Sequence, residues 1–172
     1  MIETPRLRLR PFNEDDLQAY HEMIFSNADV TRFLPGGKPR PLEGTKTVLD
    51  FAIAHQKKHG FSIWAVERRA DYHFLGHCGL VYLRDTPQVE VAYAFGTAFW
   101  GQGYATETAR ASLQYGFQTL KLDRILALSF PDNIASQRVM QKIGMRHQGE
   151  TEQYYQTRLV LYTADRADWP PA

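Results

Sequence analysis

The spacing of apolar residues in this chain changes repeatedly between the period of a strand and the period of a helix. Near the start, Leu7 and Leu9 alternate with arginines, which is the two-residue period of a half-buried strand. Further along, Ala109, Leu113 and Phe117 recur at helical spacing and form one apolar stripe. Because neither period persists along the chain, the sequence predicts a mixed α/β fold.

The order of these segments predicts one domain over residues 1–172, with a mixed central sheet of about seven strands and flanking helices. Three prolines and two glycines between residues 27 and 41 predict a loop. Glycines at positions 60 and 144 are expected to end two of the helices. The expected strands cover residues 7–12, 61–67, 74–83, 89–95, 124–130, 145–151 and 156–164, and the expected helices cover 13–24, 42–59, 103–120 and 133–143.

Composition and charge exclude several classes of protein. A chain of 172 residues with 44% hydrophobic residues can bury about 70% of its unfolded surface, so its core needs no disulfide or metal. Cys78 is the only cysteine, so no intrachain disulfide can form. The net charge of +1 gives no long-range attraction to nucleic acid. The chain contains no run of about eighteen apolar residues, so no membrane span is predicted. We expect no nucleic-acid or membrane partner, no signal peptide, and a cytoplasmic location.

The most informative segment is the strand at 89–95, which is followed by a loop with Gly101 and Gly103 and then by a helix. The start of a helix exposes unpaired backbone N–H groups that attract anions, and glycine lets the backbone approach a phosphate closely. The Rossmann fingerprint is excluded because Thr106 replaces its third glycine, and a Walker loop is excluded because no Gly-Lys-Ser/Thr sequence is present. The segment predicts a pyrophosphate site, with a plain tight connection as the alternative.

Three segments together resemble the GNAT superfamily of acetyltransferases. They read TPRLRLRP at 4–11, WGQGYATE at 100–107 and NIASQRVMQKIGM at 133–145. Within the superfamily, they are most similar to the ribosomal-protein N-acetyltransferase branch (RimJ/RimL-like). The segments occur in the order and spacing of that branch, so the resemblance covers essentially the whole chain.

The resemblance implies an acetyl-CoA-dependent N-acetyltransferase with a splayed central sheet, which binds the coenzyme as a co-substrate between its fourth and fifth strands. The backbone of Ala94, Phe95 and Gly96 is then expected to pair with the pantetheine amides as an added strand would. Trp100 stands where the superfamily usually has Arg or Gln, a change that is frequent in this branch. The other residues expected to contact the coenzyme are Gly101, Gln102, Gly103, Tyr104, Ala105, Thr106 and Asn133.

Transfer of an acetyl group to an amine requires a neutral nucleophile, and Glu90 is the candidate general base. It is the one carboxylate in an otherwise apolar strand, and burial there would raise its pKa toward neutrality. The resemblance agrees, because several members of the superfamily have a glutamate at this position that acts through water. The alternative is a solvated glutamate, or one paired with an arginine such as Arg84.

The departing thiolate also needs a partner, and Ser136 is the candidate. The superfamily often has a tyrosine seven residues after the asparagine that starts the last helix, but that position is Met140 here. Ser136 follows Asn133 by three residues on the same helical face, and a serine would hydrogen-bond the thiolate more readily than protonate it. The alternative is that Asn133 caps the helix and Ser136 is only a polar residue of its first turn. Tyr154, Tyr155 and Tyr162 are left unassigned, because the sequence does not determine which face of their strands they occupy.

No metal site is expected. His55 and His59 have the spacing of ligands on a helix, but Gln56 replaces the glutamate of a zinc protease motif and no third ligand is evident. Cys78 lies in an apolar run and is interpreted as a core residue.

The partner expected from these residues is an amine substrate, in particular a protein or peptide N-terminal α-amine. Two alternatives stay open, namely a small-molecule amine such as a polyamine or an antibiotic, and a non-catalytic module that only binds acyl-CoA. The oligomeric state is also open, with a homodimer among the options.

Overall fold

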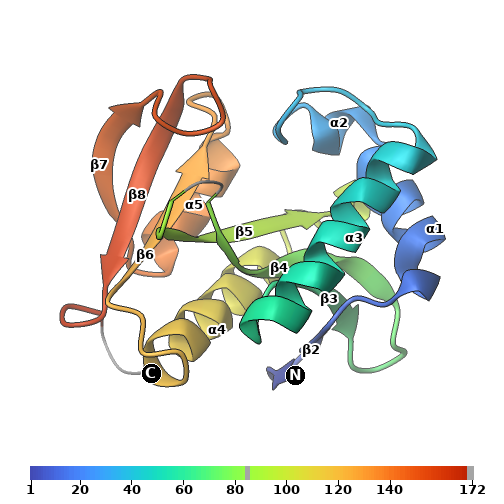
Figure 1. Cartoon of the computed structure of the whole chain (residues 1–172), viewed down its shortest axis with the longest axis horizontal. Coiled ribbons are helices and arrows are strands. Elements are labelled where there is room, and N and C mark those ends of the chain that lie inside the picture. Colours follow the sequence, from blue (N-terminus) through green and yellow to red (C-terminus); the bar gives the residue numbers. More distant parts are fainter. Residues whose placement is uncertain (84–85, 170–172) are drawn as a thin grey trace.

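The computed structural model describes residues 1–83 and 86–169 and contains one eight-stranded sheet flanked by helices (Figure 1). The sheet order is β1-β2-β3-β4-β5-β6-β8-β7. The strands are β1 (Ile2–Glu3), β2 (Leu7–Arg10), β3 (Ile63–Arg68), β4 (Phe74–Tyr82), β5 (Val89–Phe95), β6 (Arg124–Ser129), β7 (Arg146–Thr151) and β8 (Leu159–Asp165). The helices are η1 (Glu14–Asp16), α1 (Leu17–Tyr20), η2 (His21–Phe25), α2 (Ala28–Thr31), α3 (Leu42–His59), η3 (Thr97–Phe99), α4 (Tyr104–Gln118) and α5 (Ile134–Lys142).

The sheet is split near its middle. Every neighbouring pair of strands is antiparallel except β5 and β6, which are parallel and share only the residue pair Glu90 and Leu126. In Figure 1, β6, β7 and β8 stand apart from the helices α1, α2 and α3 on the opposite side of the molecule. This confirms the predicted mixed and splayed α/β sheet, with β1 as a two-residue strand beyond the seven expected.

Local signals in the sequence explain where the long helices begin and end. α3 ends at Gly60, which has a φ of 80° and caps the helix in the left-handed conformation, as expected from the sequence. α4 begins after Gly103 and α5 begins after Asn133, whose side chain accepts a hydrogen bond from the backbone N–H of Ser136. No helix in the described part of the chain is long and apolar enough to cross a membrane.

The region before α3 differs from its prediction. One helix was expected over 13–24, but the chain forms a 3-10 turn, a single α-helical turn and a π-helix in succession. Asn13 caps the N-terminus of the first of these turns through a capping box. The predicted loop at 27–41 contains the short α2, because Asn27 caps it by accepting a hydrogen bond from the N–H of Asp29. These are short-range capping effects that the apolar period does not reveal.

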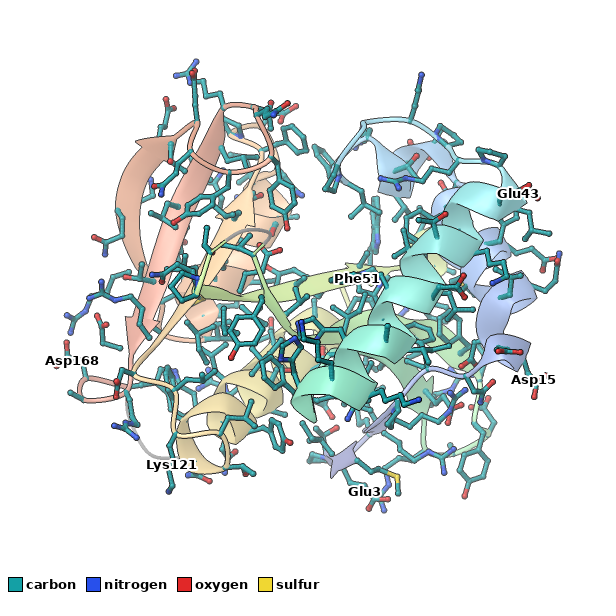
Figure 2. All side chains as sticks on the ribbon, viewed as in Figure 1. Glu3, Asp15, Glu43, Phe51, Lys121 and Asp168 are labelled. Carbon is teal, nitrogen blue, oxygen red and sulfur yellow. The ribbon has the colours of Figure 1, made fainter. Side chains whose placement is uncertain are left out.

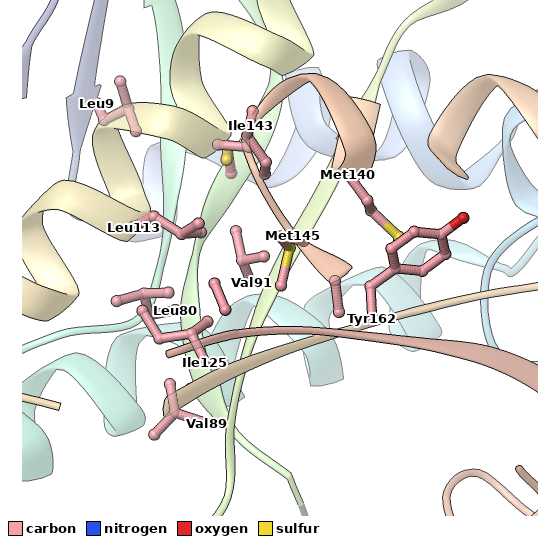
Figure 3. Packing of buried hydrophobic residues seen from close by; sticks show 14 of the residues in the cluster. Leu9, Leu80, Val89, Val91, Leu113, Ile125, Met140, Ile143, Met145 and Tyr162 are labelled. Atoms are coloured by element: carbon pink, nitrogen blue, oxygen red, sulfur yellow. The ribbon is translucent and has the colours of Figure 1, made fainter. Parts of the chain in front are cut away.

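Two apolar cores lie on opposite faces of the sheet. One packs α4 and α5 against the sheet and includes Leu80, Val91, Leu113 and Ile125 (Figure 3). The other packs η2 and α3 against it and includes Tyr20, Ile24, Leu49, Ile63 and Ala94. Since side chains alternate along a strand, β5 contributes to both cores. This alternation decides which face each candidate catalytic residue occupies.

Gly116→Ala is expected to lower the stability of the fold. Gly116 lets α4 approach the sheet, because a Cβ there would lie 2.6 Å from Ile125 Cδ1 and 2.9 Å from Leu80 Cδ1. Helix propensity alone favours alanine by about 1 kcal/mol, whereas overpacking a core costs about 1–3 kcal/mol. We expect urea denaturation to show a net loss of up to about 2 kcal/mol. Gly44→Ala on α3 is the control, because the atom nearest to the added Cβ would be Arg40 Cβ at 3.2 Å. A gain in stability from Gly116→Ala would contradict the packing argument.

Candidate active site

Glu90 occupies the point at which β5 and β6 separate. It pairs with Val81 of β4 on one side and with Leu126 of β6 on the other, and it is only 6% exposed. The hydroxyl of Tyr155, in the loop between β7 and β8, donates a hydrogen bond to Glu90 Oε1. Burial raises the pKa of Glu90 to about 7, and the hydrogen bond from Tyr155 partly offsets that rise. A carboxyl with this pKa can exchange a proton near neutral pH. The alternative partner, Arg84, lies outside the described residues.

A groove of about 860 Å³ lies on the face of the sheet that α3 covers, and two neighbours of Glu90 line it, although Glu90 itself does not. Val81 and Tyr155 both line it, which places it next to the carboxylate that they flank. Phe51 of α3 also lines it, is exposed, and appears near the centre of the view in Figure 2. Its walls are mainly apolar and aromatic, and the other lining residues are Val48, His55, His59, Tyr82, Leu83, Thr86 and Pro87.

Ser136 lies near Tyr93, a residue to which the sequence pattern assigns no role. Tyr93 Oη lies 2.9 Å from Ser136 Oγ and 3.1 Å from the Ser136 carbonyl oxygen. Burial raises the pKa of Tyr93, so its phenol stays protonated. Tyr93 follows Glu90 by three residues on β5, so its side chain projects from the opposite face of the sheet. The spacing of three residues between Glu90 and Tyr93 was the signal in the sequence that could have identified Tyr93. This spacing points to Ser136 only once α5 is known to pack on the face that Tyr93 occupies.

Met140 and Tyr162 are core residues. Met140 is 1% exposed, and Figure 3 shows it beside the ring of Tyr162. The Tyr162 hydroxyl accepts a weak hydrogen bond of 3.3 Å from the side-chain amide of Gln141. The position at which the superfamily often has a tyrosine therefore supplies apolar packing here. Of the three tyrosines that were left unassigned, Tyr155 is the one that contacts Glu90.

The end of β5 and the glycine loop are braced together. Trp100 Nε1 donates to the Phe95 carbonyl oxygen at 2.8 Å, which fixes the loop against the strand. The Gly96 N–H donates to the Leu75 carbonyl of β4 at 3.0 Å, so this amide is used within the sheet. Hydrogen-bonding groups alternate between the two edges of a strand, so the backbone N–H of Phe95 faces the gap between β5 and β6. Ala94, which precedes Phe95, is buried in the core under α3.

The glycine loop has the backbone conformation that its sequence predicts. Gly101 and Gly103 have φ values of 74° and 81°, in the left-handed region that disfavours other residues. The Gln102 side chain donates to the Ala98 carbonyl oxygen at 2.8 Å and so supports the loop from within. The first turn of α4 then begins with Tyr104, which is buried, while Ala105 and Thr106 are half-buried.

The N-terminal motif contacts the glycine-loop motif directly. Glu107 accepts hydrogen bonds from Thr4 Oγ1 at 2.6 Å, from the Arg6 N–H at 3.0 Å and from Arg6 Nε at 2.7 Å. The same guanidinium donates to the Gln102 carbonyl oxygen at 3.1 Å and lies 4.5 Å from the centre of the Tyr104 ring. Two of the three segments that carry the resemblance, 4–11 and 100–107, therefore form one structural unit.

The histidines and the cysteine have structural contacts. His55 Nδ1 lies 2.7 Å from the Phe61 carbonyl oxygen, and His55 Nε2 accepts from the Tyr82 N–H at 3.2 Å, so both ring nitrogens are engaged. Within residues 1–83 and 86–169, no group of three His, Cys, Asp or Glu side chains is arranged to hold a metal. Cys78 is buried, which raises the pKa of its thiol to about 11. His55 therefore joins α3 to the sheet, whereas Cys78 lies on the other face, 3.6 Å from Ser112 Oγ of α4.

Comparison with known proteins identifies the family. Residues 6–146 match the acetyltransferase (GNAT) domain, so the chain belongs to the GNAT family of acyltransferases. YkkB of Bacillus subtilis is 34% identical over 163 residues, which cover 94% of this chain and 93% of YkkB. YoaA, an uncharacterized N-acetyltransferase of the same organism, is 33% identical over 90% of this chain and 87% of its own length.

Solved structures share the same fold. The GNAT-family acetyltransferase from Bacillus anthracis superposes with a TM-score of 0.83 at 28% identity, over 97% of this chain and 99% of the other. RimL, a ribosomal L7/L12 α-N-protein acetyltransferase in complex with coenzyme A, has a TM-score of 0.79 over 94% of this chain and 95% of its own. At 17% identity, RimL shows the fold alone. Acetyl-CoA is the acyl donor used by this fold.

Glu90→Gln is expected to stabilise the fold by an amount that depends on pH. The pKa of Glu90 is raised from 4.5 to about 7 on folding, so the native state binds more protons than the unfolded state between these values. Native stability therefore falls as pH rises through that window. The penalty is fully present above about pH 7, where it is on the order of 3 kcal/mol, and absent below about pH 4.5. Urea unfolding at about pH 8 and pH 4 measures it, and an equal difference at both pH values would contradict the raised pKa.

Proposed function

We propose that this protein is an N-acetyltransferase that moves the acetyl group of acetyl-CoA to a primary amine, with Glu90 as the general base. The observation that carries the proposal is the burial of Glu90 where β5 and β6 separate, with a pKa of about 7 and a groove beside it. A carboxylate with that pKa accepts a proton at neutral pH and returns it to solvent readily. Glu90 takes the amine proton, directly or through a water, as the nitrogen attacks the thioester carbonyl.

The coenzyme binds on the other side of the split sheet. The gap-facing backbone N–H of Phe95 pairs with a pantetheine carbonyl, next to Ala94 and Gly96. The loop and the start of α4, from Gly101 through Gln102, Gly103, Tyr104 and Ala105 to Thr106, hold the pyrophosphate with backbone N–H groups at the positive end of the helix. Asn133 fixes the first turn of α5 near the thioester. The two left-handed glycines support this role, because a Cβ at either would meet almost no protein atom and would project into open space.

Ser136 and Tyr93 serve the leaving thiolate. Their hydroxyls are hydrogen-bonded to each other and lie on the face of β5 opposite to Glu90. One hydroxyl can donate to the sulfur while the other orients it, which stabilises the negative charge that develops when the C–S bond breaks. The amine and the thioester would then meet at the split in the sheet from opposite faces.

The acceptor that we favour is a protein or peptide N-terminal α-amine, as in the RimJ/RimL-like branch. An α-amine near pKa 8 loses about 1.4 kcal/mol at pH 7 to protonation, whereas a lysine-like amine loses about 4.6 kcal/mol. The largely apolar groove beside Glu90 suits the side chain of a first residue better than it suits a polycation. The activity of RimL on a protein α-amine supports the proposal by analogy only. A cytoplasmic location and a homodimer stay predictions.

Gly103→Val is expected to raise the dissociation constant of acetyl-CoA at least about tenfold. Gly103 has a φ of 81°, and a side chain there would project toward the bound pyrophosphate and change the course of the loop. Gly60→Val is the matched control, because Gly60 has a φ of 80° with no atom near its missing Cβ and lies at the far end of α3. Isothermal titration calorimetry on both folded variants measures the effect. If both variants bind acetyl-CoA with the same dissociation constant, the glycine loop is not part of the coenzyme site.

A competition assay tests the acceptor class. Purified protein is incubated with acetyl-CoA, a mixture of peptides with free N-termini and spermidine, and the products are identified by mass spectrometry. We expect peptide α-amines to be acetylated with the higher kcat/KM. A preference of at least about tenfold for spermidine would overturn the peptide assignment. Failure of every amine in a broad panel to consume the thioester would favour the non-catalytic acyl-CoA-binding module.

A further inference from the structure

The loop between β7 and β8 carries one side chain across the split sheet to β5. Tyr155 donates its hydroxyl to Glu90 Oε1 although the two residues are 65 positions apart. Tyr155 and Gln156 have φ values of 55° and 51°, and two consecutive non-glycine residues in this region are uncommon. Such conformations persist where surrounding contacts impose them, frequently at functional sites. The backbone of the loop is therefore shaped to project Tyr155 toward the carboxylate.

Contacts at the base of the loop hold this shape. Arg158 forms a two-point ion pair with Glu150, with N–O distances of 2.6 and 2.9 Å. The N–H of Gln153 donates to Thr151 Oγ1 at 3.1 Å. These contacts close the hairpin below Tyr155 and leave its side chain free to reach the groove.

Packing alone does not explain why Tyr155 is placed here. The residue is 47% exposed and lines the groove, whereas the carboxylate that it contacts is buried. A side chain that served the core would lie inside it, as Tyr162 does at 2% exposure. The polar end of Tyr155, and not its ring, makes the contact that spans the two halves of the sheet.

We propose that Tyr155 is a positioning residue that orients the Glu90 carboxylate toward the groove and favours its ionised form. This inference rests on the proposed role of Glu90 as the base. A phenol O–H donated to a carboxylate stabilises the anion and fixes which oxygen stays free for a proton. The phenol remains the donor, because desolvation of its hydroxyl end and the neighbouring Glu90 carboxylate raise the pKa of Tyr155.

Few other titratable groups face this carboxylate within the described part of the chain. His55 and His59 of α3 and Tyr82 of β4 line the same groove, and β6 presents the apolar Leu126. His55 is held by two backbone contacts, and burial lowers its pKa, so it is neutral near pH 7. Loss of the Tyr155 hydroxyl should therefore appear as a shift in the titration of Glu90.

Tyr155→Phe tests the proposal through the pH dependence of activity. The ratio of the kcat/KM of the variant to that of the wild type is measured from about pH 6 to pH 9.5 with saturating acetyl-CoA and the best peptide acceptor, so that titration of the amine cancels. Loss of the hydrogen bond raises the pKa of Glu90 by about one unit. The ratio should fall about tenfold near pH 6 and return toward one above pH 8.5. Tyr154→Phe, in the same loop, is the control and should leave the ratio flat.

The same measurements in a Glu90→Gln background separate the two proposals. Glu90→Gln alone should lower kcat/KM roughly 10²-fold near pH 7 and less at high pH, where free amine accumulates. Adding Tyr155→Phe to that variant should cause no further pH-dependent loss. A uniform loss at every pH from Tyr155→Phe that is equally large in the wild type and in the Glu90→Gln background would overturn the positioning role and leave Glu90 as the base. A pH-independent effect of Glu90→Gln would instead overturn the proposed base itself.

Discussion

The loss of pairing between β5 and β6 is the constraint on which the site depends. These two strands share the single pair of Glu90 and Leu126, and beyond it the end of β5 has an unpaired edge. In an ordinary sheet such an edge would be covered, because unsatisfied backbone groups are costly. Here α4 and α5 hold one face while η2 and α3 hold the other, so the sheet remains open without falling apart. In the proposed function, this opening would offer a ligand backbone hydrogen bonds on one side and a carboxylate on the other.

Burial of a glutamate lowers the stability of a fold, and Glu90 has no cationic partner within residues 1–83 and 86–169. Glu67 offers a contrast, because it is also buried but forms ion pairs with Arg8 and Arg10. Glu67 connects β2 and β3 as a paired charge, whereas Glu90 has a phenol as its neighbour and a pKa near neutrality. Within the described residues, this fold neutralises the buried carboxylate of Glu67 with two arginines and provides no such partner for Glu90 at the split in the sheet.

The ends of the long helices were predictable from nearby residues, whereas long-range contacts were not. The ends of α3 and α5 follow from Gly60 and Gly144, and Glu90 was selected because one carboxylate interrupted an apolar strand. The contacts of Tyr155 with Glu90 and of Tyr93 with Ser136 depend on loop conformation and on the packing of α5, which span 65 and 43 residues of sequence. The π-helix at His21–Phe25 and the two-residue β1 also escaped prediction, because neither has an apolar period of its own.

The alternation of side chains along β5 has a consequence for how such a protein can diverge. Residues that would receive the acceptor belong to α3, the end of β4 and the β7–β8 loop, whereas residues that would receive the coenzyme belong to the glycine loop and α5. One strand separates the two sets, and few side chains belong to both. Mutations can therefore accumulate on the acceptor face and change which amine is recognised while the donor face stays intact. A gene duplicate of this fold could acquire a new substrate in small steps, each of which preserves the reaction.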